Sequence, residues 1–163
     1  MSIVIINGIS AEIQKRVLGA NMCFHGLRKH LSSHLTSKNT KILMYKVLIR
    51  RVLTCASETW TLSKTHERRL SLFEKKVFRC NFGAKQENET MRKRYNYELY
   101  EACNEPNIVN YIKVNRIAWA WHLMRMNNER ILKKIFNNKP NGLRRFGKSK
   151  LRWEDGVDQG VEY

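Results

Sequence analysis

The acidic residues are the first candidates for chemistry, because two-metal polymerases and most nucleases hold Mg²⁺ with clustered carboxylates. The chain has 14 acidic residues, of which Asp155 and Asp158 are the two aspartates. The glutamates are scattered among basic neighbours. The aspartates lie three positions apart beside Glu154 and Glu162, a spacing typical of a solvated acidic helix end. The sequence therefore predicts no catalytic residues and no enzyme activity.

Cysteine and histidine offer a second kind of site. None of the four cysteines, Cys23, Cys55, Cys80 and Cys103, forms a CxxC pair, which favours free buried thiols in a reducing compartment. On a helix over 11–34, Cys23, His30 and His34 share one face and could hold Zn²⁺. Because no fourth ligand is evident, the pattern favours a core cysteine beside two surface histidines, with no metal and no cofactor. A Cys–His catalytic pair lacks an oxyanion hole and an orienting third group.

The charge balance points to a polyanionic partner. The chain carries 31 Lys+Arg against 14 Asp+Glu, a formal charge of +17. The densest run, 125–152, has Glu129 as its one acid, and aromatic Phe136, Phe146 and Trp153 lie in or beside it. Such a run suits phosphate contact and predicts an RNA or DNA backbone as partner. A solvated face remains the alternative. A membrane is disfavoured because Gly and Pro interrupt the run and no apolar stretch approaches 20 residues. No small-molecule ligand is indicated.

The periodicity predicts an all-α fold of about six or seven helices, because apolar residues recur every three or four positions and no segment alternates with period two. Ser10 is the expected cap of the first helix and Gly83 the stop of the third. The helix starting at Pro106 has a broad apolar surface and is expected to be the most buried. The expected helices cover 10–35, 37–56, 64–82, 95–103, 106–126 and 129–137, with a short one from Lys150.

These elements group into four expected regions. Residues 7–83 form a helical bundle, and 84–91, which lacks an apolar period, is the best linker candidate. Residues 92–138 form a second helical segment. Residues 139–163 form a basic, Gly/Pro-punctuated tail with one short helix.

Several segments, in order, carry a resemblance to a known family. They are Lys-Ile-Leu-Met-Tyr-Lys-Val-Leu-Ile-Arg-Arg-Val-Leu-Thr-Cys-Ala-Ser-Glu-Thr-Trp (41–60), Glu-Arg-Arg-Leu (67–70), Phe-Glu-Lys-Lys-Val (73–77), Arg-Tyr-Asn and Glu-Leu-Tyr (94–100), Arg-Ile-Ala-Trp-Ala-Trp-His-Leu-Met-Arg-Met (116–126) and Leu-Arg-Trp-Glu-Asp-Gly-Val (151–157). Together they resemble the region C-terminal to the polymerase palm in non-LTR (LINE-type) retrotransposon reverse transcriptases. The resemblance covers about residues 7–158.

The resemblance implies that the first sixty residues match the helical thumb, which tracks the primer–template duplex. It places the family's palm, with its catalytic aspartates, and its endonuclease upstream of this chain. The expectation is therefore a palm-less, non-catalytic remnant that binds nucleic-acid backbone without sequence specificity. The residues expected to contact phosphate are Lys41, Lys46, Arg50, Arg144, Arg145, Lys148, Lys150 and Arg152.

Four positions depart from the family pattern. Arg51 stands where the family has Pro, and Cys55-Ala56 where it has Tyr-Gly. Trp121 replaces a Gly, and an indole placed in a close helix contact overpacks it by about 1–3 kcal/mol. Gly147-Lys148-Ser149-Lys150 replaces a Gly-Arg-Pro-Arg-type stretch. These changes are typical of a decaying element copy.

Two other functions fit the sequence. In the first, the helices form a protein-interaction module whose exposed apolar face once packed on a palm. In the second, the chain is a helix-turn-helix DNA-binding protein, although no segment offers a clear recognition helix. The expected location is intracellular, with the nucleus as a candidate compartment.

Overall fold

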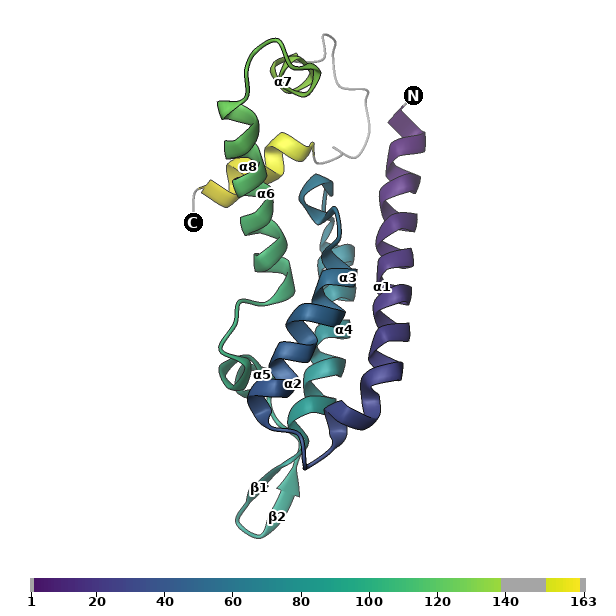
Figure 1. Cartoon of the computed structure of the whole chain (residues 1–163), viewed down its shortest axis with the longest axis vertical. Helices are drawn as coiled ribbons and strands as arrows, with labels where there is room; N and C mark the ends of the chain where they lie inside the picture. The colour runs from purple at the N-terminus through teal and green to yellow at the C-terminus, as the bar shows by residue number, and fades with distance from the viewer. Residues whose placement is uncertain (1, 139–151, 162–163) are drawn as a thin grey trace. The chain divides into compact units, whose positions relative to one another are not determined.

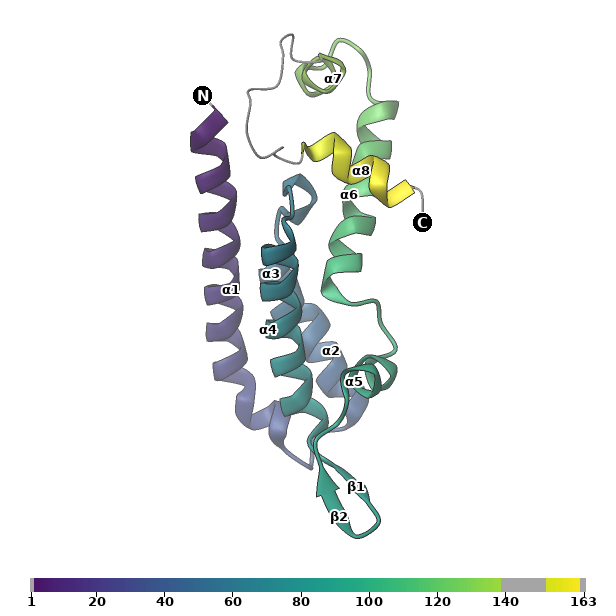
Figure 2. The ribbon, with the colours of Figure 1, turned by 180° about the vertical axis from the view of Figure 1, so that it is seen from behind.

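The fold is all-α with one short β-hairpin (Figures 1 and 2), as the periodicity predicts. The computed structural model describes residues 2–138 and 152–161, with side chains placed for 8–138 and 152–157. The helices are α1 (Ser2–Ser32), α2 (Lys38–Met44), the π-helix η1 (Tyr45–Arg50), α3 (Arg51–Thr54), the 3₁₀ turn η2 (Ser57–Thr59), α4 (Lys64–Phe82), α5 (Asn96–Cys103), α6 (Ile108–Arg125), α7 (Ile131–Asn137) and α8 (Trp153–Val161). The strands are β1 (Lys85–Glu87) and β2 (Thr90–Arg92).

The chain divides into two compact units. Unit 1 comprises Met1–Cys55 and Leu62–Tyr111, and unit 2 comprises Ala56–Thr61 and Ile112–Tyr163. In unit 1, α1 packs along α3 and α4, and α5 packs on α4. Its core is apolar and draws on each of these helices: Ile13, Ala20, Phe24, Leu31, Tyr45, Ile49, Leu53, Leu70, Phe73, Val77, Phe78 and Leu99.

The bounds of α4 follow from local signals in the sequence. The Ser63 hydroxyl accepts the backbone N–H of His66 (3.3 Å), which caps the first turn. At the other end Gly83 has φ +63° and donates its N–H to the Arg79 carbonyl (3.1 Å). A left-handed residue at this position terminates a helix, and glycine adopts it without steric cost. The expected helix over 64–82 is confirmed at both ends.

Helix α1 differs from the prediction at its start. It begins at Ser2, so Ser10 lies inside the helix and is not its cap. No proline precedes Ser10, and a lone glycine, Gly8, does not stop a helix. The Ser10 hydroxyl instead lies 3.4 Å from Nε2 of His66 on α4.

A β-hairpin occupies the segment expected as a linker, and it lies within unit 1. Strands β1 and β2 pair antiparallel, and the turn residues Asn88 and Glu89 both have positive φ, 46° and 67°. Two consecutive positive φ angles are typical of the type I′ turn, which matches the strand twist. Glycine usually marks this turn, and its absence here left the hairpin without a sequence signal.

Helix α6 is buried along one face and exposed along another. Ile108, Ile112, Arg116 and Ala120 form a buried stripe with a spacing of four, whereas Val114, Trp121 and Met124 are more than half exposed. Because the Trp121 indole is exposed, it overpacks no helix contact. The expected cost of this departure from the family pattern is therefore absent.

Ala56, another departure, has φ 59° and ψ 21°, the left-handed conformation that favours glycine. We expect Ala56→Gly to raise the free energy of unfolding by about 1 kcal/mol, because Cβ is strained there. Ala118→Gly, in the exposed face of α6, is the control and should lower it by about 1 kcal/mol. Urea unfolding of both variants measures the difference, and a destabilised Ala56→Gly variant would contradict the strain.

Candidate nucleic-acid interface

Lys41, the first residue expected to contact phosphate, is buried in unit 1. Its Nζ donates to the backbone carbonyl of Asn81 at the end of α4 (3.2 Å). Lys41 precedes Tyr45, Ile49 and Leu53 at successive intervals of four, so the buried stripe of this helical segment includes it. This spacing of four is the sequence signal that indicates a buried position for Lys41.

Lys46 and Arg50 both bind one carboxylate. Lys46 Nζ forms an ion pair with Glu105, and Arg50 Nη1 lies 3.2 Å from the other oxygen of Glu105. The Arg50 guanidinium also stacks over the Tyr111 ring, 4.3 Å from its centroid. The hydrogen bonds from Lys46 and Arg50 lower the pKa of Glu105. Both cations therefore hold the turn between α5 and α6 in this structure.

Glu74 is a buried polar group of unit 1 that the sequence analysis does not predict. Its carboxylate accepts three hydrogen bonds, from the Tyr45 hydroxyl (2.6 Å), the Tyr100 hydroxyl (3.0 Å) and the backbone N–H of Ile108 (3.1 Å). Burial raises the pKa of Glu74 even though these donors lower it. Burial and the Glu74 charge raise the pKa of Tyr45 well above its usual range. The carboxylate joins η1, α4, α5 and the first residue of α6.

The remaining predicted residues lie in the tail. Arg144, Arg145, Lys148 and Lys150 fall outside the described residues. Arg152 is exposed, and its backbone N–H donates to Oδ2 of Asp155 in the first turn of α8 (2.9 Å). Among these five tail residues the structure therefore describes the surroundings of Arg152.

Helix α8 is held within unit 2 by Trp153 and Gly156. The Trp153 indole donates to the Glu58 carbonyl (2.7 Å) and meets the Phe136 ring edge to face at 6.1 Å. A Cβ at Gly156 would clash with the guanidinium of buried Arg116, so α8 approaches this side chain closely. Phe136 and Trp153 therefore both have contacts within unit 2.

The outward face of α4 is rich in basic side chains. It carries six basic side chains, five exposed and Lys75 half-buried: Lys64, Arg68, Arg69, Lys75, Lys76 and Arg79. On a helical projection they fall on one side of the helix, whereas Glu67 and Glu74 lie off this face. We call these six residues the α4 basic face. A helical projection of residues 64–82 would have revealed the α4 basic face from the sequence.

The contacts of the α4 basic face leave its charge uncompensated. Lys76 donates to Oδ1 of Asn21 on α1 (3.1 Å), and Arg79 donates to Oδ1 of Asn96 (3.0 Å). Among the residues that the structure describes, none of the six forms an ion pair with a carboxylate. Neighbouring like charges repel one another, so this face favours an anionic partner.

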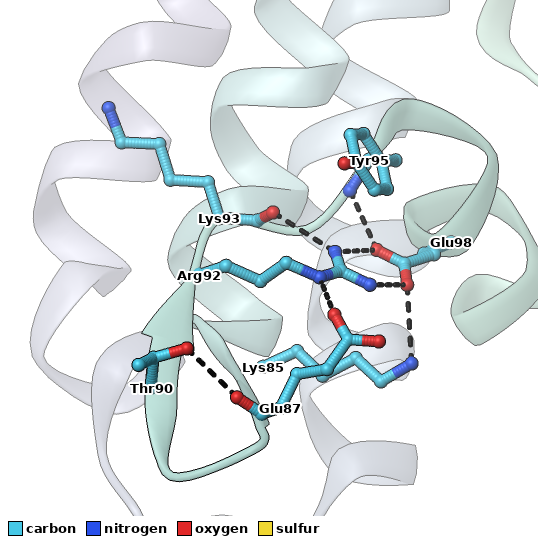
Figure 3. A network of polar contacts seen from close by, with 7 residues as sticks. All are labelled: Lys85, Glu87, Thr90, Arg92, Lys93, Tyr95 and Glu98. Atoms are coloured by element: carbon cyan, nitrogen blue, oxygen red, sulfur yellow. Dashed lines mark hydrogen bonds and ion pairs between the residues drawn. The ribbon is translucent and has the colours of Figure 1, made fainter.

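The hairpin has its own charge cluster, in which two acids neutralise the cations (Figure 3). Arg92 forms a bidentate pair with Glu98 of α5 (2.8 and 2.9 Å), and it also binds Glu87 across the hairpin. Lys85 and the Tyr95 backbone N–H complete the contacts of Glu98. These hydrogen bonds, that from Arg92 first, lower the pKa of Glu98 to about 2. The cluster fixes the hairpin against the start of α5.

This cluster predicts an acid-dependent stability. The ordinary pKa of glutamate is near 4.5, so the stabilisation is complete above that pH and disappears as the pH falls through about 2. We expect Arg92→Gln to lower stability at pH 6 and to flatten this pH dependence. Thermal unfolding between pH 6 and 2 measures both effects, with Lys93→Gln as the exposed neighbouring control. If Arg92→Gln loses as much stability between pH 6 and 2 as the parent does, Arg92 does not stabilise the ionised form of Glu98.

The cysteines and histidines form no metal cluster: among the described side chains no group of three His, Cys, Asp or Glu residues could hold a metal ion. Cys23 is half-buried in α1, and His30 and His34 are exposed. Burial raises the pKa of the Cys103 thiol to about 11, with Glu74 adding to the effect. Thiolate is the nucleophilic form, so Cys103 is unreactive near neutral pH.

Comparison with family models, curated proteins and solved structures finds no match to this chain. Within the described part of the chain, no helix is both long enough and apolar enough to span a membrane.

Proposed function

We propose that this chain is a non-catalytic nucleic-acid-binding protein that contacts the phosphate backbone of RNA or DNA without sequence preference. The observation that carries the proposal is the α4 basic face, six cations without a carboxylate partner among the described residues. Because an α-helix rises 1.5 Å per residue, positions 64 and 79 lie about 22 Å apart along the helix axis. Phosphates along one strand of a duplex advance about 3.4 Å each, so this face has the length of about six phosphates.

The proposed origin is the post-palm region of a non-LTR retrotransposon reverse transcriptase, on the motifs quoted above. In that origin the helices of unit 1 descend from a thumb, an element that tracks a duplex without reading it. Lysine and arginine contacts to phosphate position a strand but carry no sequence information. The net charge of +17 supports the same class of partner. The basic tail residues Arg144, Arg145, Lys148 and Lys150 are proposed to add phosphate contacts.

The test is the salt dependence of binding. Fluorescence anisotropy with single strands and duplexes of unrelated sequence should give similar affinities, and log K should fall with log salt by about 0.9 per phosphate neutralised on B-DNA. Five to eight contacts predict a slope of about −4 to −7. Replacing the four tail residues by alanine should flatten the slope by up to about four units and weaken all sequences alike. A preference for one sequence above about a hundredfold would contradict the proposal.

A protein-interaction module is the second candidate, and exposed apolar side chains favour it. In α7, Ile131, Leu132 and Ile135 share one face and are each more than half exposed. Trp121 and Met124 of α6 are also exposed. The same salt titration separates the two candidates, because an affinity for nucleic acid that is weak and independent of salt leaves the interaction module as the better explanation.

A further inference from the structure

A polar cavity of about 270 Å³ opens in unit 1, where α2 begins and α4 ends. Its chemistry comes from Lys38, Lys41, Asn81, Phe82, Arg94 and His34. None of the described residues that line it is a carboxylate. The described lining thus gathers three cations and an imidazole without an acidic residue among them.

Buried polar atoms at this cavity lack partners. The Asn81 side chain is 4% exposed, and neither its Oδ1 nor its Nδ2 has a hydrogen-bond partner. The Nε of half-buried Arg94 is likewise buried and unpartnered. Native proteins satisfy nearly all such groups, so each unpartnered group needs an explanation. Here two donors and one acceptor belong to residues that line one polar cavity.

Two carbonyls at the end of α4 already have hydrogen-bond donors. The backbone carbonyl of Asn81 already accepts from Lys41 Nζ, and that of Arg79 accepts from the Gly83 N–H. An ammonium group has three N–H donors, so Lys41 keeps two beyond this bond. Lys38 Nζ lies 5.9 Å from the centroid of the Phe82 ring, which brings a second ammonium to the cavity.

From these groups we propose that the cavity binds the phosphate group of a phosphorylated sugar or nucleotide. Lysine and arginine donors bind phosphate oxygens through charge-assisted hydrogen bonds. The volume exceeds that of a phosphate, and the rest of it, beside the Phe82 ring, holds the group that carries the phosphate.

The bound phosphate has two possible sources, a free sugar phosphate and the terminal phosphate of a nucleic-acid strand. The second source rests on the proposed function and the first does not. The α4 basic face and this cavity are different sites, because Lys64, Arg68 and Arg69 do not line the cavity. Each site can therefore fail its test without the other.

The experiment uses the full chain labelled with ¹⁵N, titrated with inorganic phosphate at constant ionic strength. We expect saturable shifts of the Asn81 side-chain amide and the Arg94 Nε–H, and no such shifts with chloride. Arg94→Gln should weaken phosphate binding by about tenfold, the loss of one charge-assisted contact. Lys38→Gln, at an exposed position, is a second variant expected to weaken it. Arg68→Gln, on the α4 basic face, is the matched control and should bind phosphate like the parent.

Ribose 5-phosphate and oligonucleotides with and without a terminal 5′-phosphate then assign the source. If the phosphorylated oligonucleotide binds more tightly than the unphosphorylated one, and Arg94→Gln abolishes that difference, the ligand is the end of a strand. If ribose 5-phosphate displaces inorganic phosphate and the terminal phosphate of the oligonucleotide has no effect, the ligand is a free sugar phosphate. Shifts that chloride reproduces, or full phosphate affinity in both Arg94→Gln and Lys38→Gln, would overturn the site. That outcome would not contradict the proposed function, which depends on salt-dependent strand binding. Conversely, if strands do not bind but phosphate still shifts these signals, the proposed function is overturned and the phosphate site is not.

Discussion

Replacing Glu74 by alanine is expected to lower the free energy of unfolding by about 3 to 5 kcal/mol. The substitution leaves three donors without an acceptor, the hydroxyls of Tyr45 and Tyr100 and the backbone N–H of Ile108. Tyr45 is 1% exposed and Ile108 is fully buried, so water cannot replace the carboxylate without opening the core. The loss of a buried hydrogen-bond network is among the few mechanisms that produce effects this large.

Urea unfolding followed by circular dichroism measures the Glu74 effect. Glu101→Ala is the matched control, because Glu101 lies exposed on α5 and should change stability by less than about 0.5 kcal/mol. Glu74→Gln should give an intermediate loss, since its amide offers one acceptor oxygen to three donors. A Glu74→Ala variant within about 1 kcal/mol of the parent would show that the network contributes little.

The same network sets a pH dependence with a definite sign. Burial raises the folded-state pKa of Glu74, so this group favours folding at low pH and loses that contribution as the pH rises through the raised pKa. The pKa of Tyr45 is also raised, and its contribution is complete below pH 10 and is lost as the pH rises further. Tyr45→Phe should therefore flatten the alkaline loss of stability.

The sequence predicted the helices where local and tertiary signals agree. The Gly83 stop and the apolar period of α4 both point to 64–82, and the apolar residues Leu70, Phe73 and Val77 are buried. Ser37 accepts the N–H of Thr40 and caps α2 in the same way. The start of α1 was misplaced because Ser10 has the residue type of a cap without being at a helix end.

Buried polar residues escaped prediction because their partners lie far away in the sequence. Glu74 has basic neighbours in sequence, Lys75 and Lys76, and no local pattern marks it as buried. Its partner Tyr45 lies 29 residues away. Lys46 and Arg50 have the expected polar character, but Glu105, 55 residues beyond Arg50, binds them. Charge alone does not separate a phosphate contact from an internal ion pair.

Exchanging Arg68, Arg69, Lys75 and Arg79 for glutamine is expected to flatten the salt slope of nucleic-acid binding by about three to four units. Each phosphate contact contributes about 0.9 to that slope, so affinity near 0.1 M salt should fall by about a thousandfold. Glutamine has nearly the helix propensity of lysine and arginine, so α4 should remain folded. Anisotropy titrations at several salt concentrations measure slope and affinity together.

The control variant removes the same charge from scattered places: Lys15, Arg51, Lys93 and Arg125, all exposed and each on a different segment, become glutamine. Net charge falls equally in both variants, so a common long-range attraction would weaken them equally. A contact surface predicts a different result, because counterions are released where phosphates are neutralised. The salt slope of the scattered variant should then change by less than about one unit. An equal change in both variants would mean that α4 is only a solvated basic helix.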